Sequence, residues 1–245
     1  MLKRYLILSL VFLAAVSMTV GAQTQIKAVV GMSLPPYIIQ GTDNGVDADI
    51  VRAALAAENY TLKLEYVPFA RVAVSMANKT ADAAFPINES SGVTGVYYSD
   101  SHISYQNVAV ALKSKGLKIA SATDLSGLRV VAFGEAPNYL GPEFAAMAKA
   151  NKKYSEIADQ QSQVKMLFKD RADVLIMDIN IFKYFRQNIK DMDVSQDVAF
   201  YEIFPPTAYK VAFTSKDVCD KFNAGLKALK ASGKYAQIFK TYINQ

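Results

Sequence analysis

Three side chains near the ends of predicted strands have the chemistry to hold a small polar molecule. Asp178 follows the apolar run 172–177, where its carboxylate could accept hydrogen bonds from a ligand ammonium or cap the next helix. Phe69 offers an aromatic surface at the start of a predicted helix, and Arg71 follows it. A guanidinium in the first turn opposes the helix dipole unless an anion is nearby, and its fork suits a carboxylate. Arg71 is therefore either a ligand contact or a solvated residue on the helix face.

Three loops add further polar and aromatic groups. Pro35-Pro36-Tyr37 makes the first loop rigid and presents Tyr37 either as an aromatic face for a ligand or as half-buried packing. Residues 134–139, which include Asn138 and Tyr139, form a strand-to-helix turn whose exposed amides could receive an anion. Segment 88–100 is rich in small polar residues and contains no Lys or Arg. These loops favour recognition by hydrogen bonds and aromatic contacts.

Catalytic and metal chemistry have little support in the sequence. His102 is the only histidine, and we interpret it as a surface residue or one that supports a site without touching a ligand. Because the chain has one histidine and one cysteine, Cys219, a zinc site with clustered His and Cys ligands is excluded. Gly92 and Gly95 do not lie between a strand and a helix with a lysine following, so no phosphate-binding loop is predicted. We expect no catalytic residue, no metal and no cofactor.

Alternating strand and helix patterns would position the candidate residues. The patterns predict strands at 25–32, 61–67, 81–86, 128–133, 172–177 and 209–214, and helices at 46–58, 69–77, 142–151, 164–169, 179–187 and 216–242 with a break at Gly233. This alternation indicates an α/β fold with mostly parallel sheets, and it restarts after a break at 113–116. Parallel sheets bind ligands beyond the carboxyl ends of their strands. The site is therefore expected in the loops after Met32, Val67, Phe85, Phe133 and Met177, in a cleft between two α/β units.

The first 22 residues predict export. Lys3 and Arg4 precede an apolar run at 5–16, and Val20-Gly21-Ala22 offers the small residues that a signal peptidase reads. The run is shorter than the roughly 20 residues of a membrane span, so cleavage is favoured over an uncleaved anchor. Cys219 is far from the cleavage site, so no cysteine is available there as a lipid acceptor. We expect a soluble protein without a lipid anchor in a Gram-negative periplasm.

The composition argues against binding of nucleic acid. Removing residues 1–22 leaves enough chain for one large domain or two smaller ones, and the 51% of hydrophobic residues can supply their cores. The formal charge is +5 at pH 7, Lys3 and Arg4 contribute to it, and the remaining basic residues are scattered among acids. No basic patch of the kind that contacts phosphates is therefore predicted.

A series of short motifs follows a fixed order along the chain. The motifs are Pro35-Pro36-Tyr37, Gly45-Val-Asp-Ala-Asp-Ile50, Asp82-Ala83-Ala84, Tyr98-Ser99-Asp100, Asp124-Leu-Ser-Gly-Leu-Arg-Val130, Ala172-Asp173 with Asp178, and Phe222-Asn-Ala-Gly-Leu226 before Gly233. Each motif is loose, but their order and spacing cover essentially the whole chain after residue 22. In this respect the sequence resembles the bacterial extracellular solute-binding proteins of family 3, whose best-known members bind polar amino acids for ABC importers.

The resemblance implies a two-lobed periplasmic binding protein, a type II Venus flytrap with mixed, mostly parallel sheets. Lobe 1 would comprise residues 23–110 and 207–245, and lobe 2 residues 111–206. Closure around a small polar solute, an amino acid or a related amine or carboxylate, would signal occupancy to the membrane subunits of an ABC importer. The resemblance also implies a monomer that is not an enzyme.

The resemblance assigns roles to individual residues. Phe69 would pack on the side chain of the ligand, and Asp178 would hold an amino group. The Arg that pairs with the carboxylate in amino-acid binders would fall at Gly92, so either Arg71 replaces it or the ligand is an amine or an uncharged solute. The predicted ligand-binding residues are Tyr37, Phe69, Arg71, Phe85, Pro86, Asn88, Asn138, Tyr139 and Asp178.

Two other functions on the same scaffold stay open. A sensory binding protein would present its ligand to a receptor on a separate chain. A dehydratase acting on prephenate-like acids would need a general acid in the cleft; Glu89 and Glu135 are conceivable, but no second group is visible beside either.

Overall fold

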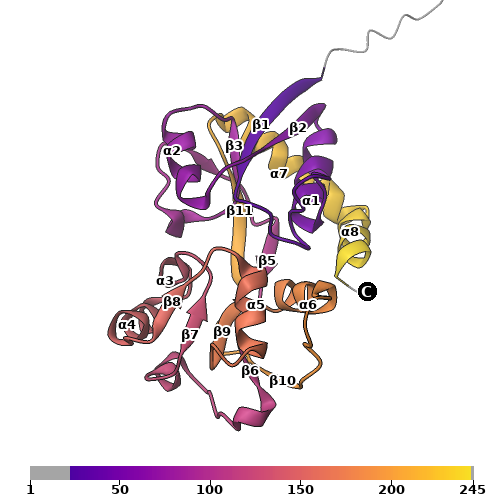
Figure 1. The fold of residues 1–245 in the computed structure, drawn as a ribbon. Coiled ribbons are helices and arrows are strands. Elements are labelled where there is room, and N and C mark those ends of the chain that lie inside the picture. The colour runs from indigo at the N-terminus through magenta and orange to yellow at the C-terminus, as the bar shows by residue number, and fades with distance from the viewer. Residues whose placement is uncertain (1–22, 244–245) are drawn as a thin grey trace, which may run out of the picture.

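The computed structural model describes residues 23–243. They form two α/β lobes, lobe 1 above lobe 2 in Figure 1, with β5 and β11 at the level where the lobes meet. The predicted signal peptide, residues 1–22, lies outside the described residues. Within the described part of the chain, no helix combines the length and the apolar character that crossing a membrane requires.

Lobe 1 is built on a six-stranded sheet with the order β2, β1, β3, β11 and β4, in which β5 also pairs with β11. Its strands are β1 (Thr24–Val30), β2 (Tyr60–Tyr66), β3 (Ala83–Ile87), β4 (Tyr97–Tyr98), β5 (Ile103–Tyr105) and β11 (Thr207–Phe213). β1 runs parallel to β2 and β3, because helical crossovers connect these three strands. β11 is antiparallel to β3, β4 and β5, because it enters the sheet as the chain returns from lobe 2.

Lobe 2 is built on a five-stranded sheet with the order β10, β6, β9, β7 and β8. Its strands are β6 (Asn107–Leu112), β7 (Val130–Ala132), β8 (Tyr154–Glu156), β9 (Val174–Asp178) and β10 (Val198–Tyr201). β7 is parallel to β8 and β9, whereas β6 is antiparallel to β9 and β10. The sheets are mixed, as predicted, but antiparallel pairings are as prominent as parallel ones, because β6 and β11 run against their neighbours.

Helices cover both faces of each sheet (Figure 1). On lobe 1, α1 (Val46–Ala56), α7 (Lys216–Ala231) and α8 (Lys234–Tyr242) lie on one face, and η1 (Phe69–Arg71) with α2 (Val72–Ala77) on the other. On lobe 2, α5 (Gln160–Phe168) and α6 (Ile179–Asn188) lie opposite α3 (Ala136–Tyr139) and α4 (Pro142–Ala150). Short 3₁₀ segments form η2 (Glu89–Ser91), η3 (Lys113–Lys115) and η4 (Ala122–Leu125). β6 packs its alternate residues into two different cores, as the two-residue period of a strand requires.

The helices α1 and α7 approach so closely that Gly225 has no room for a side chain. A Cβ atom at Gly225 would lie 2.1 Å from the backbone oxygen of Ala54 in α1. The absence of a side chain at this position therefore sets the distance between the two helices that cover the lobe 1 sheet.

Several predicted boundaries differ from the structure by one residue or more, and two of these differences have a clear physical reason. The lobe boundary after residue 110 falls inside β6, and because this strand pairs with β9 and β10, the chain changes sheets at Gln106 instead. The helix predicted at 164–169 begins earlier, at Gln160, because the carboxylate of Asp159 accepts a hydrogen bond from the Gln161 amide (3.1 Å) and caps the helix there.

Candidate functional site

A cavity of about 250 Å³ lies between the lobes, and both lobes line it. Each of the five predicted strand ends has at least one lining residue beside it; after Phe85 this residue is Pro86, which still belongs to β3. The lining residues are Gly31, Met32, Ser33, Leu34, Ile38, Pro68, Phe69, Pro86, Tyr105 and Tyr209 from lobe 1, and Asn107, Phe133, Gly134, Tyr139, Ala158, Gln160, Asp178 and Ile181 from lobe 2. The cavity therefore changes shape if the lobes move relative to one another.

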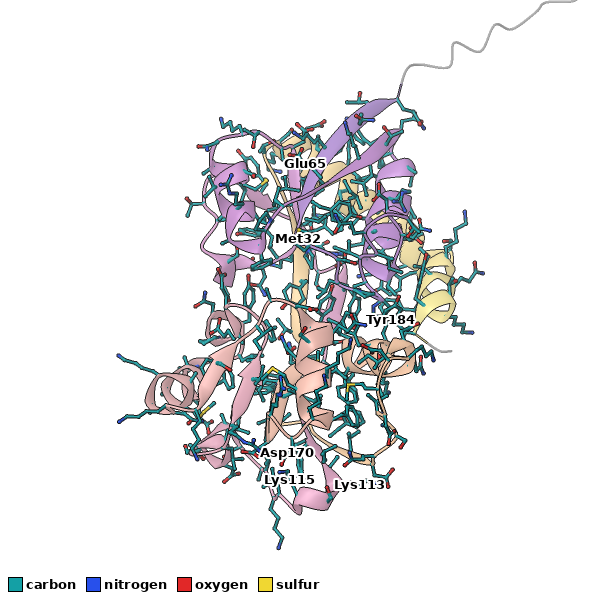
Figure 2. The ribbon with its side chains drawn as sticks, in the orientation of Figure 1. Met32, Glu65, Lys113, Lys115, Asp170 and Tyr184 are labelled. Atoms are coloured by element: carbon teal, nitrogen blue, oxygen red, sulfur yellow. The ribbon has the colours of Figure 1, made fainter. Side chains whose placement is uncertain are left out.

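The position of the cavity can be followed in Figure 2 from Met32, which lies at the edge of lobe 1 that faces lobe 2. Its side chain is 54% exposed. The ion pair between Lys115 and Asp170 (2.6 Å) lies at the opposite end of lobe 2. That ion pair is consequently remote from the site.

Four aromatic rings form a continuous wall of the cavity. Tyr105 contacts Tyr209 at 4.7 Å between ring centroids, Tyr209 contacts Tyr139 at 6.0 Å, and Tyr139 contacts Phe69 edge-on at 6.2 Å. Tyr139 belongs to lobe 2, whereas Tyr209 and Phe69 belong to lobe 1. The aromatic wall therefore crosses from one lobe to the other and offers ring faces to a ligand on both sides.

Asp178 is the acidic residue of the lining and caps α6 from the end of β9. Its Oδ1 accepts hydrogen bonds from the amides of Asn180 (2.8 Å) and Ile181 (3.0 Å) and from the hydroxyl of Tyr37 (3.0 Å). Its Oδ2 accepts one hydrogen bond, from the Gln106 amide at 2.9 Å. Both roles considered from the sequence, helix cap and cavity residue, are thus combined in one side chain.

Burial raises the pKa of Asp178 to about 6, because the low-dielectric interior disfavours the charged carboxylate. The four donors around the carboxyl group oppose this effect, since they stabilise its ionised form. The side chain is only 2% exposed. At neutral pH the cavity therefore contains a buried negative charge.

Tyr37 holds the Asp178 carboxylate from behind the cavity. Its hydroxyl donates to Asp178 and accepts from the side-chain amide of Asn180 (3.0 Å), both of which belong to lobe 2. The Tyr37 ring stacks on Tyr105 at 3.8 Å, and only 1% of the residue is exposed. The burial of Tyr37, together with the Asp178 charge, raises its pKa well above 10. Tyr37 therefore ties lobe 1 to the acidic group of lobe 2 and lies outside the cavity lining.

A buried acid–histidine pair continues this network into lobe 1. Tyr105 donates its hydroxyl to Asp47 Oδ2 at 3.0 Å, and Asp47 Oδ1 is hydrogen-bonded to Nε2 of His102. Neither Asp47 nor His102 has any exposed surface. Of the two alternatives considered for His102, a surface residue or one that supports a site, the first is wrong, because the first turn of α1 brings Asp47 into the interior as its partner.

Three buried polar atoms in the cavity lining lack a hydrogen-bond partner in the described part of the protein. They are Asn107 Nδ2, the hydroxyl oxygen of Tyr139 and Gln160 Oε1. A buried polar atom without a partner is costly, and native proteins rarely leave one so. All three residues line the cavity, so each brings to the site a polar group that has no partner among the described residues. Of the three residues, the sequence pointed only to Tyr139; a polar Asn at the start of the buried strand β6 was the available signal for Asn107.

Besides Tyr37, four of the predicted ligand-binding residues lie outside the lining. Arg71 and Asn138 are exposed. Asn88 uses its side chain to accept from the Ser90 amide and to donate to the Ala208 carbonyl, each at 3.0 Å. Phe85 is buried against His102, because successive residues of β3 face opposite ways and its neighbour Pro86 faces the cavity. The lining thus includes Phe69, Pro86, Tyr139 and Asp178 from the predicted set.

The loop after β3 uses its polar groups internally. Ser91 donates its hydroxyl to the Asn88 carbonyl at 2.7 Å, and Tyr98 donates to the Val93 carbonyl at 2.9 Å. Gly92 adopts a left-handed conformation, φ 71°, in the same loop. No residue of this loop is part of the cavity lining, so its small polar residues stabilise the loop itself.

The two carboxylates considered for acid catalysis are also outside the lining. Glu89 pairs with Lys210 at 2.5 Å, and this hydrogen bond lowers the pKa of Glu89. The backbone amide of Glu135 donates to Glu156 at 2.6 Å. Neither residue therefore offers a carboxyl group to the cavity.

Comparisons with known proteins identify the scaffold. The family model of the bacterial extracellular solute-binding proteins, family 3, matches residues 26–245. Comparison with curated proteins gives no match. Among solved structures, a mutant of ArgBP from T. maritima is 19% identical, with a TM-score of 0.72 over 90% of this chain and 96% of that one.

Two further solved structures are similar. The substrate-binding protein of an ABC uptake transporter from Streptococcus pneumoniae, with bound histidine, is 20% identical and has a TM-score of 0.71 over 90% of this chain and 93% of that one. A histidine kinase sensor domain is 14% identical, with a TM-score of 0.75 over 91% of this chain and 97% of that one. At these identities the likeness establishes the fold.

Proposed function

Because this chain belongs to the bacterial extracellular solute-binding proteins of family 3, we propose that it captures a small polar solute between its lobes and delivers it to an ABC importer. The observation that carries this proposal is that three residues lining one cavity each have a buried polar atom without a partner among the described residues. These groups lose their hydrogen bonds to water when the protein folds. A solute that hydrogen-bonds to them would replace those bonds and would be recognised in this way.

We propose Phe69, Pro86, Tyr139 and Asp178 as direct contacts of the solute, with Tyr37 positioning the Asp178 carboxylate. Tyr105, Tyr209, Asn107 and Gln160, which also line the cavity, are added to the proposed contacts. The remaining predicted residues, Arg71, Phe85, Asn88 and Asn138, reach a solute only if the lobes rearrange. Closure of the lobes around the solute would exclude water from the aromatic wall.

Export and the oligomeric state belong to the same proposal. We propose that residues 1–22 are removed on export and that the released protein works in the periplasm as a monomer without a lipid anchor. The solute-bound monomer would be the form that the membrane subunits of the importer recognise. Intact-mass measurement of protein recovered from the periplasm, with light scattering for the molar mass, tests these statements.

Binding without turnover separates this function from the dehydratase alternative. The two candidate acids, Glu89 and Glu135, lie outside the lining, which supports a binding protein. The sensory alternative has the support of one similar fold, the histidine kinase sensor domain. Transport is favoured because the family description is that of solute-binding proteins, and loss of solute uptake in a deletion strain would distinguish transport from sensing.

The experiment for the proposed function is identification of the bound solute. Native mass spectrometry of the purified protein, followed by a thermal-shift panel of amino acids, amines and small carboxylates, should give at least one ligand. A ligand at 100 times its Kd stabilises the folded state by about 2.7 kcal/mol. Chemical conversion of the bound molecule on incubation would show an enzyme, and the absence of any ligand would contradict solute capture.

A further inference from the structure

The charge of the cavity lining is unbalanced. Asp178 is the one acidic side chain among the described residues that line the cavity, and no Lys, Arg or His side chain of the described chain lines it. The nearest candidate for a cationic partner in the sequence, Arg71, is exposed and outside the lining. A ligand with a carboxylate would therefore bring a second negative charge beside Asp178 without a cation to pair with it.

Helix ends at the cavity do not change this balance. The lining residues Gln160 and Asp178 lie at the start of α5 and α6, where a helix dipole attracts anions. However, each start is already capped by a carboxylate, Asp159 on α5 and Asp178 on α6. The Gln161 amide of α5 and the Asn180 and Ile181 amides of α6 are thus engaged by acidic side chains of the protein.

The aromatic wall suits a positive charge. The rings of Phe69, Tyr105, Tyr139 and Tyr209 line the same cavity as the Asp178 carboxylate. Aromatic ring faces attract ammonium groups, most strongly when water is excluded. The carboxylate also retains acceptor capacity, because Asp178 Oδ2 receives one protein hydrogen bond, from Gln106.

From this arrangement we propose that the cavity selects a small organic cation that carries no carboxylate, an amine or a quaternary ammonium compound. The inference rests on the proposed function and narrows its solute class. The positive charge lies between the Asp178 carboxylate and the aromatic rings, and a neutral polar group of the ligand bonds to Asn107 Nδ2, Tyr139 or Gln160 Oε1. A zwitterionic amino acid is disfavoured because its carboxylate finds no cation in the lining.

Matched ligand pairs test this selectivity by isothermal titration calorimetry at pH 7.5. Each pair compares a cation with a relative that carries a carboxylate: agmatine with arginine, histamine with histidine, cadaverine with lysine, and choline with glycine betaine. The neutral isostere of choline, 3,3-dimethyl-1-butanol, separates charge from shape. We expect the cation to bind at least tenfold tighter than its partner in every pair that binds, and choline at least tenfold tighter than the neutral alcohol if it binds.

Three variants locate the cation. Asp178→Asn should weaken cation binding at least tenfold, and Phe69→Leu, at a partly exposed ring, should weaken it severalfold without altering the thermal unfolding midpoint of the free protein. Arg71→Ala is the matched control, and it should leave cation affinity within twofold of the wild type. Retained affinity in Phe69→Leu and Asp178→Asn together would overturn the placement.

The outcomes distinguish this inference from the proposed function. Tighter binding of an amino acid or of glycine betaine, or equal binding of the neutral isostere, overturns the cation inference and leaves solute capture standing. Loss of amino-acid binding in Arg71→Ala would then identify the anion partner. If no ligand binds and native mass spectrometry finds none, the proposed function fails and the inference fails with it.

Discussion

Replacement of Tyr37 by phenylalanine removes one hydroxyl group from the contact between the lobes and keeps the ring. The hydroxyl donates to Asp178 and accepts from Asn180, each at 3.0 Å, while the ring stacks on Tyr105. A hydrogen bond to a charged group is worth about 1.5–3 kcal/mol, and the side-chain amide of Asn180 also loses its acceptor. We therefore expect Tyr37→Phe to lower the free energy of unfolding by about 2 kcal/mol at pH 7.5.

The same substitution should shift the pH dependence of ligand binding. The Tyr37 hydroxyl stabilises the ionised carboxylate, so its removal raises the pKa of Asp178 above the wild-type value of about 6. Of the other titratable groups of this network, Tyr105, Tyr209 and Asp47 carry no positive charge, and the His102 ring is hydrogen-bonded to Asp47 and not to Asp178. Cation affinity should fall as the pH drops through about 6 in the wild type, and the midpoint should lie at higher pH in the variant.

The assay is urea unfolding followed by far-UV circular dichroism, because the chain has no Trp. Tyr97→Phe, at a tyrosine that is 46% exposed, is the matched control and should stay within about 0.5 kcal/mol of the wild type. Calorimetric titrations between pH 5 and pH 8 give the binding midpoint. The reasoning is refuted if Tyr37→Phe matches the control in stability and the wild type in its binding midpoint.

Three further predictions follow from the packing and the charges. Gly225→Ala places a Cβ 2.1 Å from the Ala54 backbone oxygen, so it should lower the free energy of unfolding by about 2 kcal/mol or more in urea. Ala224→Ser, on the exposed face of α7, is the control and should be neutral. Equal stability of the two variants would contradict the close helix contact. The pKa of Asp178 rises from 3.8 to about 6 on folding, so at 1.36 kcal/mol per pKa unit its contribution to the free energy of unfolding should fall by about 3 kcal/mol as the pH rises from about 3 to about 7 and stay level above that. The difference between wild type and Asp178→Asn across this pH range isolates that slope, and a flat difference would show that the carboxyl group is not buried as described. Asn107→Ala removes a buried amide whose nitrogen has no protein partner among the described residues. It should therefore weaken solute binding about tenfold and lower the free energy of unfolding less than Tyr37→Phe does. Unchanged affinity would place the solute elsewhere.

The predicted strand ends indicated the region of the cavity because each of them is recognised from a local sequence pattern. An apolar run followed by Asp178, or by Pro68 and Phe69, marks the carboxyl end of a strand whatever the rest of the chain does. The α/β class and the family resemblance follow from the same local signals in their order along the chain. Membership of the family is confirmed by the match over residues 26–245.

The residues that sequence reasoning missed depend on contacts between distant segments. Tyr105, Asn107 and Tyr209 lie on the antiparallel strands β5, β6 and β11, which pass between the lobes and are not covered by the rule for parallel strand ends. His102 is buried and hydrogen-bonded to Asp47, which lies 55 positions earlier in the chain, and no local sequence pattern predicts such a pairing. Asn88 illustrates the opposite case, because a polar residue at a strand end is satisfied by the Ala208 carbonyl rather than by a solute.

The measurement that tests the central claim most directly is a crystal structure of the protein with the solute identified by native mass spectrometry. The account predicts density for that solute between the lobes, with polar atoms within hydrogen-bond distance of Asp178 and Asn107 and with the solute in contact with the ring of Phe69 or Tyr209. A solute bound outside this cavity would contradict it. So would a solute bound through Arg71 while Asp178 only caps its helix and does not contact the solute.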